Sequence, residues 1–224
     1  MTCVGNDDDL REVTLAENGV FASMRSDAIF IDHTTASAKV AKELAHYSEI
    51  SVLDAPVSGG QVGAENGVLS IMCGGDQSDF DRALPILESY GKNISLIGPS
   101  GAGQQCKMVN QIAIAGLVQA LSEALNFSNC AGLDGKRVLD VISGGAAGSW
   151  QMNNRGETML DGAFDFGFAV DWMRKDLEIV FNEADEIGAD VTFTKEVDKL
   201  YKMVQENGGG RWDTSSLISL LKDH

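Results

Sequence analysis

Short apolar runs alternate with amphipathic stretches through the first hundred residues of the chain. Residues 28–31 (Ala-Ile-Phe-Ile) form an apolar run that ends in Asp32, which is typical of a buried strand in a parallel sheet. Apolar positions at helical spacing then predict a helix over residues 36–47. The same reasoning predicts further strands at residues 2–4, 51–54, 68–72 and 94–97, and a helix over residues 76–88. This alternation predicts a doubly wound α/β half.

The pattern changes at the glycine-rich segment 98–103, after which only helical patterns follow. The first, from Gln104 to Cys130, is apolar nearly all round, so we expect it to be buried in a helical domain or in an oligomer interface. Further helices are predicted at residues 136–142, 149–160, 170–187 and 195–206, and a last one begins at Asp213, a good N-cap. The carboxyl-terminal half is therefore predicted to be all-helical.

Composition and charge exclude several classes of protein. The chain has 224 residues, 44% of them hydrophobic, which is the composition of a folded globular protein rather than a disordered one. Its formal net charge of −16 argues against a nucleic-acid partner and an anionic membrane surface. The longest apolar stretch, residues 112–118, is too short to span a bilayer, so no membrane partner is expected.

The cysteines and the amino terminus bear on the compartment. The four cysteines, at positions 3, 73, 106 and 130, lack the paired spacing of zinc or redox sites, so they are interpreted as reduced, buried thiols and no metal is expected. The first residues lack the basic start and the apolar run of a secretory signal. A cytoplasmic protein is therefore predicted.

Lys107 is the first candidate for chemistry. It shares one helical face with Asn110 and Gln111, because spacings of three and four residues return to the same side. Most lysines near a helix end are solvated surface residues. The apolar neighbours and the preceding glycine-rich turn favour burial here, and burial lowers the pKa of a lysine towards neutrality, where it can act as an acid or a base.

Three other segments have both an ordinary and a functional interpretation. Ser58, Gly59 and Gly60 can form a plain turn, or their backbone N–H groups and the serine hydroxyl can bind a substrate carboxylate. The segment Asp32–Thr35 follows a strand, where ligands bind in open α/β sheets, although one of its threonines could merely cap the next helix. Lys175 and Asp176, on a predicted helix, are usually only a surface charge pair.

Together these segments resemble the β-hydroxyacid dehydrogenase family, of the 3-hydroxyisobutyrate dehydrogenase type. The family has an Asp-x-Ser/Thr-Thr turn, an Asp-Ala-Pro-Val-Ser-Gly-Gly segment, a glycine-rich helix start with Lys-x-x-Asn, and a late Lys-Asp-Leu. This chain matches them, in the same order, at residues 32–35, 54–60, 98–110 and 175–177. The resemblance covers essentially the whole chain. It implies a partial Rossmann domain over residues 1–99, an all-helical substrate and dimerisation domain over residues 100–224, and NAD or NADP as cofactor.

The resemblance also implies a role for each matching residue. Lys107 corresponds to the catalytic lysine, which protonates the forming alkoxide during hydride transfer or deprotonates the alcohol in the reverse direction. The implied substrate is a small hydroxy acid or its semialdehyde. Its contacts are then Ser58, Gly59, Gly60, Asn110 and Gln111. The implied cofactor contacts are Val4, Gly5, Thr35 and Lys175.

The chain departs from the family pattern at two points. Gln111 stands where the family usually has asparagine, and the additional methylene moves the amide, which alters the expected shape of the substrate. The strand, glycine-rich turn and helix that normally open a dinucleotide-binding half do not occur, and Gly98, Gly101 and Gly103 lie at the domain junction instead. Met1 is interpreted as a possible internal methionine of a longer chain, and this chain alone is expected to bind cofactor weakly.

Two alternatives accompany this interpretation. One is a glyoxylate or semialdehyde reductase of the same family, whereas imine reduction is disfavoured by the presence of Lys107. The other is a non-catalytic, truncated, dimeric binding protein. A homodimer or higher homo-oligomer is expected in each case, because of the apolar helix that begins near Gln104.

Overall fold

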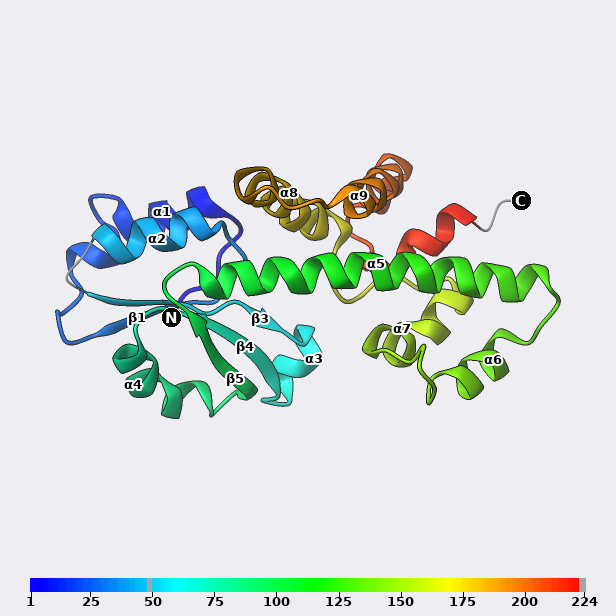
Figure 1. Cartoon of the computed structure of the whole chain (residues 1–224), viewed down its shortest axis with the longest axis horizontal. Helices are drawn as coiled ribbons and strands as arrows, with labels where there is room; N and C mark the ends of the chain where they lie inside the picture. The colour runs from blue at the N-terminus through cyan, green and yellow to red at the C-terminus, as the bar shows by residue number, and fades with distance from the viewer. Residues whose placement is uncertain (48–49, 222–224) are drawn as a thin grey trace. The chain divides into compact units, whose positions relative to one another are not determined.

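The computed structural model describes residues 1–47 and 50–221, and the chain divides into two compact units, Met1–Val109 and Asn110–His224 (Figure 1). The division falls inside one long helix, α5 (Ala102–Cys130), and the predicted domain boundary at residues 99 and 100 lies just before this helix begins. The elements of the first unit that precede α5 are α1 (Asp7–Leu15), a 3₁₀ turn (Val20–Ala22), β1 (Ile29–Asp32), α2 (Ala38–Tyr47), β2 (Ser51–Asp54), β3 (Val57–Ser58), α3 (Gly60–Glu65), β4 (Leu69–Gly74), α4 (Gln77–Leu87) and β5 (Gly91–Gly98).

The strands of the first unit form one mixed sheet. Its order is β1-β2-β4-β3, and β5, which lies off this path, also pairs with β4. β1 and β2 are parallel, with Asp32 opposite Asp54, and β4 and β5 are also parallel. β4 runs antiparallel to β2 and β3. The strand predicted at residues 2–4 is a single parallel bridge between Thr2 and Asp32. The predicted α/β fold class is confirmed.

Helices cover both faces of this sheet, as a doubly wound arrangement requires. α4 packs on one face, where its buried Phe80, Ala83 and Leu87 meet strand residues such as Leu53 and Ile71. α1 and α2 pack on the other face around Phe30 and Val52 of the strands (Figure 1). Both faces of β1 and β2 are thus covered by helices. This explains why these strands are apolar runs in which polar and apolar residues do not alternate.

The second unit is all-helical, as predicted. Besides the greater part of α5 it contains α6 (Gly135–Ile142), α7 (Trp150–Asp161), α8 (Val170–Ile187), α9 (Thr192–Val204), a π-helical turn (Gln205–Gly209) and a 3₁₀ helix (Thr214–Leu221). Two apolar clusters line α5. One joins it to α8 and α9, and the other joins it to α6 and α7. The 3₁₀ helix contributes Leu217 to the first cluster and Ile218 to the second.

Within this single chain, α5 is buried in the helical domain on one face only. Val109, Leu117 and Phe127 are 65%, 45% and 73% exposed, while Ala115, Val118 and Leu125 on the opposite side are buried. By length and composition α5 could also cross a membrane, but buried core helices of water-soluble folds meet the same criterion. Its apolar character is therefore divided between a core face and an exposed stripe.

Three elements and two cysteines differ from the prediction. α1, β3 and α3 were not predicted; α1 starts with three aspartates after the N-cap Asn6, whose side chain accepts a hydrogen bond from Asp9 N. Acids in the first turn stabilise a helix without giving it an apolar pattern. None of the four cysteines forms a disulfide bond, but Cys3 and Cys130 are exposed, so the interpretation of buried thiols is wrong for those two.

Candidate active site

Three loops that carry predicted site residues lie at the same end of the sheet in the first unit, where β1 and β2 finish. The parallel register places the carboxyl ends of β1 and β2 side by side. The parallel bridge between Thr2 and Asp32 brings the loop that follows Thr2 to the same end of the sheet. Val4 and Gly5 lie in that loop, and Val4 N donates a hydrogen bond of 3.0 Å to Thr34 Oγ1. Ligands of open α/β sheets bind beyond the carboxyl ends of parallel strands. The structure thus brings Val4, Gly5 and Thr35 together.

The turn that carries Thr35 is held from two sides. Asp32, at the end of β1, accepts a 3.0 Å hydrogen bond from Thr34 N. Gln104, in the first turn of α5, donates to Thr34 O at 2.8 Å and accepts from Ala36 N at 3.0 Å. Gln104 is fully buried, and nothing in the motif pattern marked it. Thr35 is therefore half-buried in a turn whose neighbouring residues Thr34 and Ala36 are both hydrogen-bonded.

The Asp32 carboxyl should give stability an unusual pH dependence. Burial raises its pKa from 3.8 to about 6, so its stabilising contribution is complete below pH 3.8 and is lost as the pH rises through 6. Asparagine can keep the bond from Thr34 N but does not titrate. The unfolding free energy of the wild type minus that of Asp32→Asn should fall by roughly 2 kcal/mol between pH 4 and pH 7. Urea titrations at several pH values measure it, and a constant difference would contradict the prediction.

Lys107 is buried, with 7% of its surface exposed, and its Nζ donates a 2.9 Å hydrogen bond to the carbonyl oxygen of Val57. Val57 immediately precedes Ser58, and both form β3. The ammonium is thus fixed against the segment that leads into the Ser58-Gly59-Gly60 turn. The expected burial of Lys107 is thus observed, unlike the surface location that is usual for a lysine.

The Ser58-Gly59-Gly60 turn needs its glycines for conformation. Gly59 has φ +130° and Gly60 has φ +63°, values that residues with a side chain rarely adopt. Ser58 and Gly59 are half-buried and Gly60 is exposed. Because neither glycine has a Cβ, a ligand can approach the backbone N–H groups of the turn closely, which suits an anionic group such as a carboxylate.

In the second unit, Gln111 and Lys175 meet on one buried carboxylate. Asp176 is 2% exposed, and its oxygens lie 2.6 Å from Gln111 Nε2 and 2.8 Å from Lys175 Nζ. Because a carboxylate only accepts, Gln111 must present its NH₂ group to Asp176, which leaves its oxygen for Asn110 Nδ2 at 2.8 Å. The interpretation of Lys175 and Asp176 as a surface charge pair is wrong. Asp176 is a buried residue that contacts two of the predicted site residues, and its sequence context did not reveal this burial.

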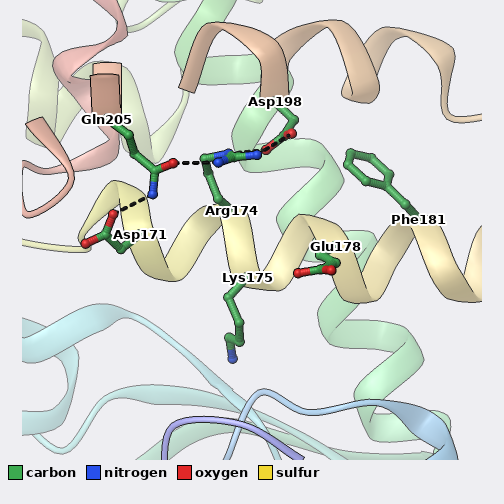
Figure 2. A pocket seen from close by; sticks show the side chains of 7 residues that line it. All are labelled: Asp171, Arg174, Lys175, Glu178, Phe181, Asp198 and Gln205. Atoms are coloured by element: carbon green, nitrogen blue, oxygen red, sulfur yellow. Dashed lines mark hydrogen bonds and ion pairs between the residues drawn. The ribbon is translucent and has the colours of Figure 1, made fainter. Parts of the chain in front are cut away.

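A polar pocket of about 470 Å³ lies in the second unit on the side of α8 (Figure 2). In Figure 2, Arg174 points towards Asp198 of α9 and Gln205 of the π-helical turn, which both bind it. Lys175 points to the opposite side of α8. Arg174 Nε lies 2.9 Å from Asp198 Oδ1, so this cation ties α8 to α9. The other lining residues are Asp171, Glu178 and Phe181.

The glycines near residue 100 serve packing rather than phosphate binding. A Cβ on Gly103 would lie 2.4 Å from Met72 O and 2.6 Å from Asp54 O, so protein backbone already fills that space. This supports the interpretation that the segment is not a dinucleotide fingerprint. The predicted cofactor contacts of the first unit, Val4, Gly5 and Thr35, lie instead in the strand-end loops. Within residues 1–47 and 50–221, no group of three or more His, Cys, Asp or Glu side chains is placed to hold a metal ion.

Two family models together cover nearly the whole chain. Residues 1–98 match the NAD-binding domain of 6-phosphogluconate dehydrogenase. Residues 101–221 match the model described as NAD-binding of NADP-dependent 3-hydroxyisobutyrate dehydrogenase. The two matched ranges adjoin just before α5. They support a cofactor that is NAD or NADP.

Individual relatives agree with these models. An uncharacterised oxidoreductase of Shewanella frigidimarina is 57% identical over 99% of this chain and 77% of that protein. The 2-hydroxy-3-oxopropionate reductase of Escherichia coli is 38% identical over 95% of this chain and 74% of that protein. A solved structure of 3-hydroxyisobutyrate dehydrogenase from Mycobacterium tuberculosis, with L-serine, has a TM-score of 0.87 at 29% identity and covers 99% of this chain and 78% of that chain.

The fold, the order of the motifs and the comparisons all agree. The family models and relatives support an oxidoreductase that uses NAD or NADP and acts on a small molecule. The chain belongs to the β-hydroxyacid dehydrogenase family, of the 3-hydroxyisobutyrate dehydrogenase type.

Proposed function

We propose that this protein interconverts a small β-hydroxy acid and its semialdehyde, with Lys107 as the general acid and base. The observation that carries the proposal is the buried Lys107 ammonium, bonded at 2.9 Å to the carbonyl immediately before Ser58. A lysine that burial and a neighbouring turn hold in place can exchange a proton with a hydroxyl group bound beside it. Hydride chemistry comes from the nicotinamide when it is bound.

The proton steps follow from the position of Lys107. In oxidation, Lys107 acts as the neutral amine, and its Nζ takes the proton of the substrate hydroxyl group as the carbonyl forms. In reduction, the same nitrogen returns a proton to the oxygen that becomes the hydroxyl. A lysine ammonium has three N–H donors, and the one donated to Val57 O orients the group.

Substrate selection is proposed to rest on the carboxylate. Ser58, Gly59 and Gly60 would bind it through backbone N–H groups and the serine hydroxyl, and the positive φ values of both glycines support this use of the turn. Asn110 and Gln111 are proposed as further substrate contacts. Val4, Gly5, Thr35 and Lys175 are proposed as cofactor contacts. The relatives that bear names act on small hydroxy or oxo acids, which supports this substrate class.

A steady-state survey tests the proposal. Small 3-hydroxy acids, their semialdehydes and glyoxylate would each be assayed with NAD(H) and NADP(H), with cofactor absorbance as the readout. A kcat/KM for 3-hydroxy acids well above that for glyoxylate supports the proposal. Preference for glyoxylate or another semialdehyde favours the reductase alternative. Absence of turnover with a cofactor that binds favours the non-catalytic binding protein.

A homodimer or higher homo-oligomer is part of the same proposal, and we place the protein in the cytoplasm. Within the second unit, α5 exposes Ala113, Leu117, Ala120, Ala124 and Phe127 along one stripe, at spacings of three and four residues. Exposed apolar patches of this kind often mark protein interfaces. Sedimentation at micromolar concentration is expected to give a dimer or larger species, and Phe127→Glu is expected to give monomers. A monomeric wild type would contradict the proposal.

A further inference from the structure

The start of α5 is fixed by one buried carboxylate at the end of β2. Asp54 is 3% exposed, and its two oxygens accept hydrogen bonds from Gly101 N at 2.7 Å and from Gln104 N at 3.0 Å. Both donors lie where α5 begins, among the N–H groups that a helix cannot pair within itself. Each oxygen of the carboxylate therefore satisfies one of them.

The same segment also holds the helix one turn later. From Asp54 the chain runs through Ala55 and Pro56 to Val57, whose carbonyl accepts the bond from Lys107 Nζ at 2.9 Å. Pro56 O accepts a 3.0 Å bond from Met72 N, which anchors this segment to β4. Lys107 lies three residues beyond Gln104, about 4.5 Å further along the helix axis.

The contact between helix and sheet tolerates little movement. Gly74 and Gly103 both face Asp54, and a Cβ on Gly74 would lie 2.5 Å from Asp54 Oδ1. The absence of side chains at these two positions lets the helix start lie directly on the strand backbone. A displacement of the helix start would therefore be passed on to Lys107, since an α-helix is stiff over one turn.

We propose that Asp54 is a positioning residue for catalysis, which sets the place of the Lys107 ammonium through the start of α5. This inference rests on the proposed role of Lys107. A carboxylate suits the position because both of its oxygens accept. An asparagine would turn an NH₂ group towards one of the two backbone N–H donors and lose that bond.

The test compares Asp54→Asn and Asp54→Ser with Asp32→Asn. The first two remove one or both bonds to α5. Asp32→Asn removes an equally buried carboxylate at the same end of the sheet but leaves those bonds intact. It is the control for the lysine signal described below and not for activity, because Asp32 holds the turn that carries Thr35. In each Asp54 variant, kcat per folded molecule should fall roughly tenfold to a hundredfold, while the KM for the cofactor changes less than about twofold. Thermal unfolding gives the folded fraction.

A second readout follows Lys107 without any turnover. In protein labelled with ¹³C and ¹⁵N lysine, the Cε–Nζ signal that is missing in Lys107→Arg reports the surroundings of this ammonium. The chemical shifts of this signal should change in both Asp54 variants and should be unchanged in Asp32→Asn. If they are unchanged in the Asp54 variants, or if activity falls only with the folded fraction, Asp54 is merely structural and the inference is overturned. A wild type without turnover refutes the proposed function instead, and the lysine signal still decides the role of Asp54.

Discussion

Lys107→Met is expected to lower kcat for a small β-hydroxy acid roughly a thousandfold, within the range of about 10²–10⁴ that general acid and base catalysis contributes. Methionine replaces the apolar stem of the buried lysine as far as Cε, but it lacks Nζ and cannot exchange a proton. The bond to Val57 O is lost, and this carbonyl is only half-buried, so water can replace the donor. Stopped-flow measurement of hydride transfer, alongside steady-state kcat, measures the effect.

Two controls separate proton transfer from other roles of Lys107. Lys107→Arg keeps the positive charge, but the guanidinium stays protonated at neutral pH, so this variant should be almost as inactive as Lys107→Met. Lys39→Met changes an exposed lysine of α2 and should leave kcat unchanged. Retained activity in Lys107→Arg would show that the charge matters rather than the proton. Cofactor affinity by calorimetry should be equal in all of these proteins.

Local signals were sufficient for the elements whose patterns are long and regular. α8 is predicted over residues 170–187 and observed at Val170–Ile187, because its apolar positions recur at helical spacing and Gly188 ends it in the left-handed conformation. The strands β1 and β2 are apolar on both faces and end at an aspartate, which also marks them in the sequence. The strand-end loops with Val4, Gly5 and Thr35 follow from those elements.

Elements and residues that depend on distant partners were not predictable. β3 is only two residues long and exists because Val57 pairs with Ile71 of β4. Asp176 looks like half of a surface charge pair until Gln111, 65 positions away, covers it. Gln104 has no motif of its own, yet it ties α5 to the Thr34 turn at a separation of 70 residues. Such contacts are tertiary, so periodicity and composition carry no trace of them.

Gly59→Ala is expected to lower kcat/KM for the hydroxy acid roughly a hundredfold, because a displacement of about 1 Å in a binding turn can cost that much. Gly59 has φ +130°, and an added Cβ would lie 3.2 Å from Leu69 Cδ2, so both backbone strain and crowding would shift the turn that begins at Ser58. The loss should appear mainly in the KM for the hydroxy acid. Cofactor affinity should stay near that of the wild type, since the proposed cofactor contacts lie in other loops.

Gly67→Ala is the matched control for Gly59→Ala. Gly67 also has a positive φ, of +65°, but it lies beyond the far end of α3, and an added Cβ would meet nothing closer than 3.7 Å. Both variants should lose stability, by about 1–3 kcal/mol each, and only Gly59→Ala should lose affinity for the hydroxy acid. Equal losses of kcat/KM in the two variants would mean that strain acts through folding alone. In that case the Ser58-Gly59-Gly60 turn could not be the carboxylate site, because its conformation would not matter for substrate binding.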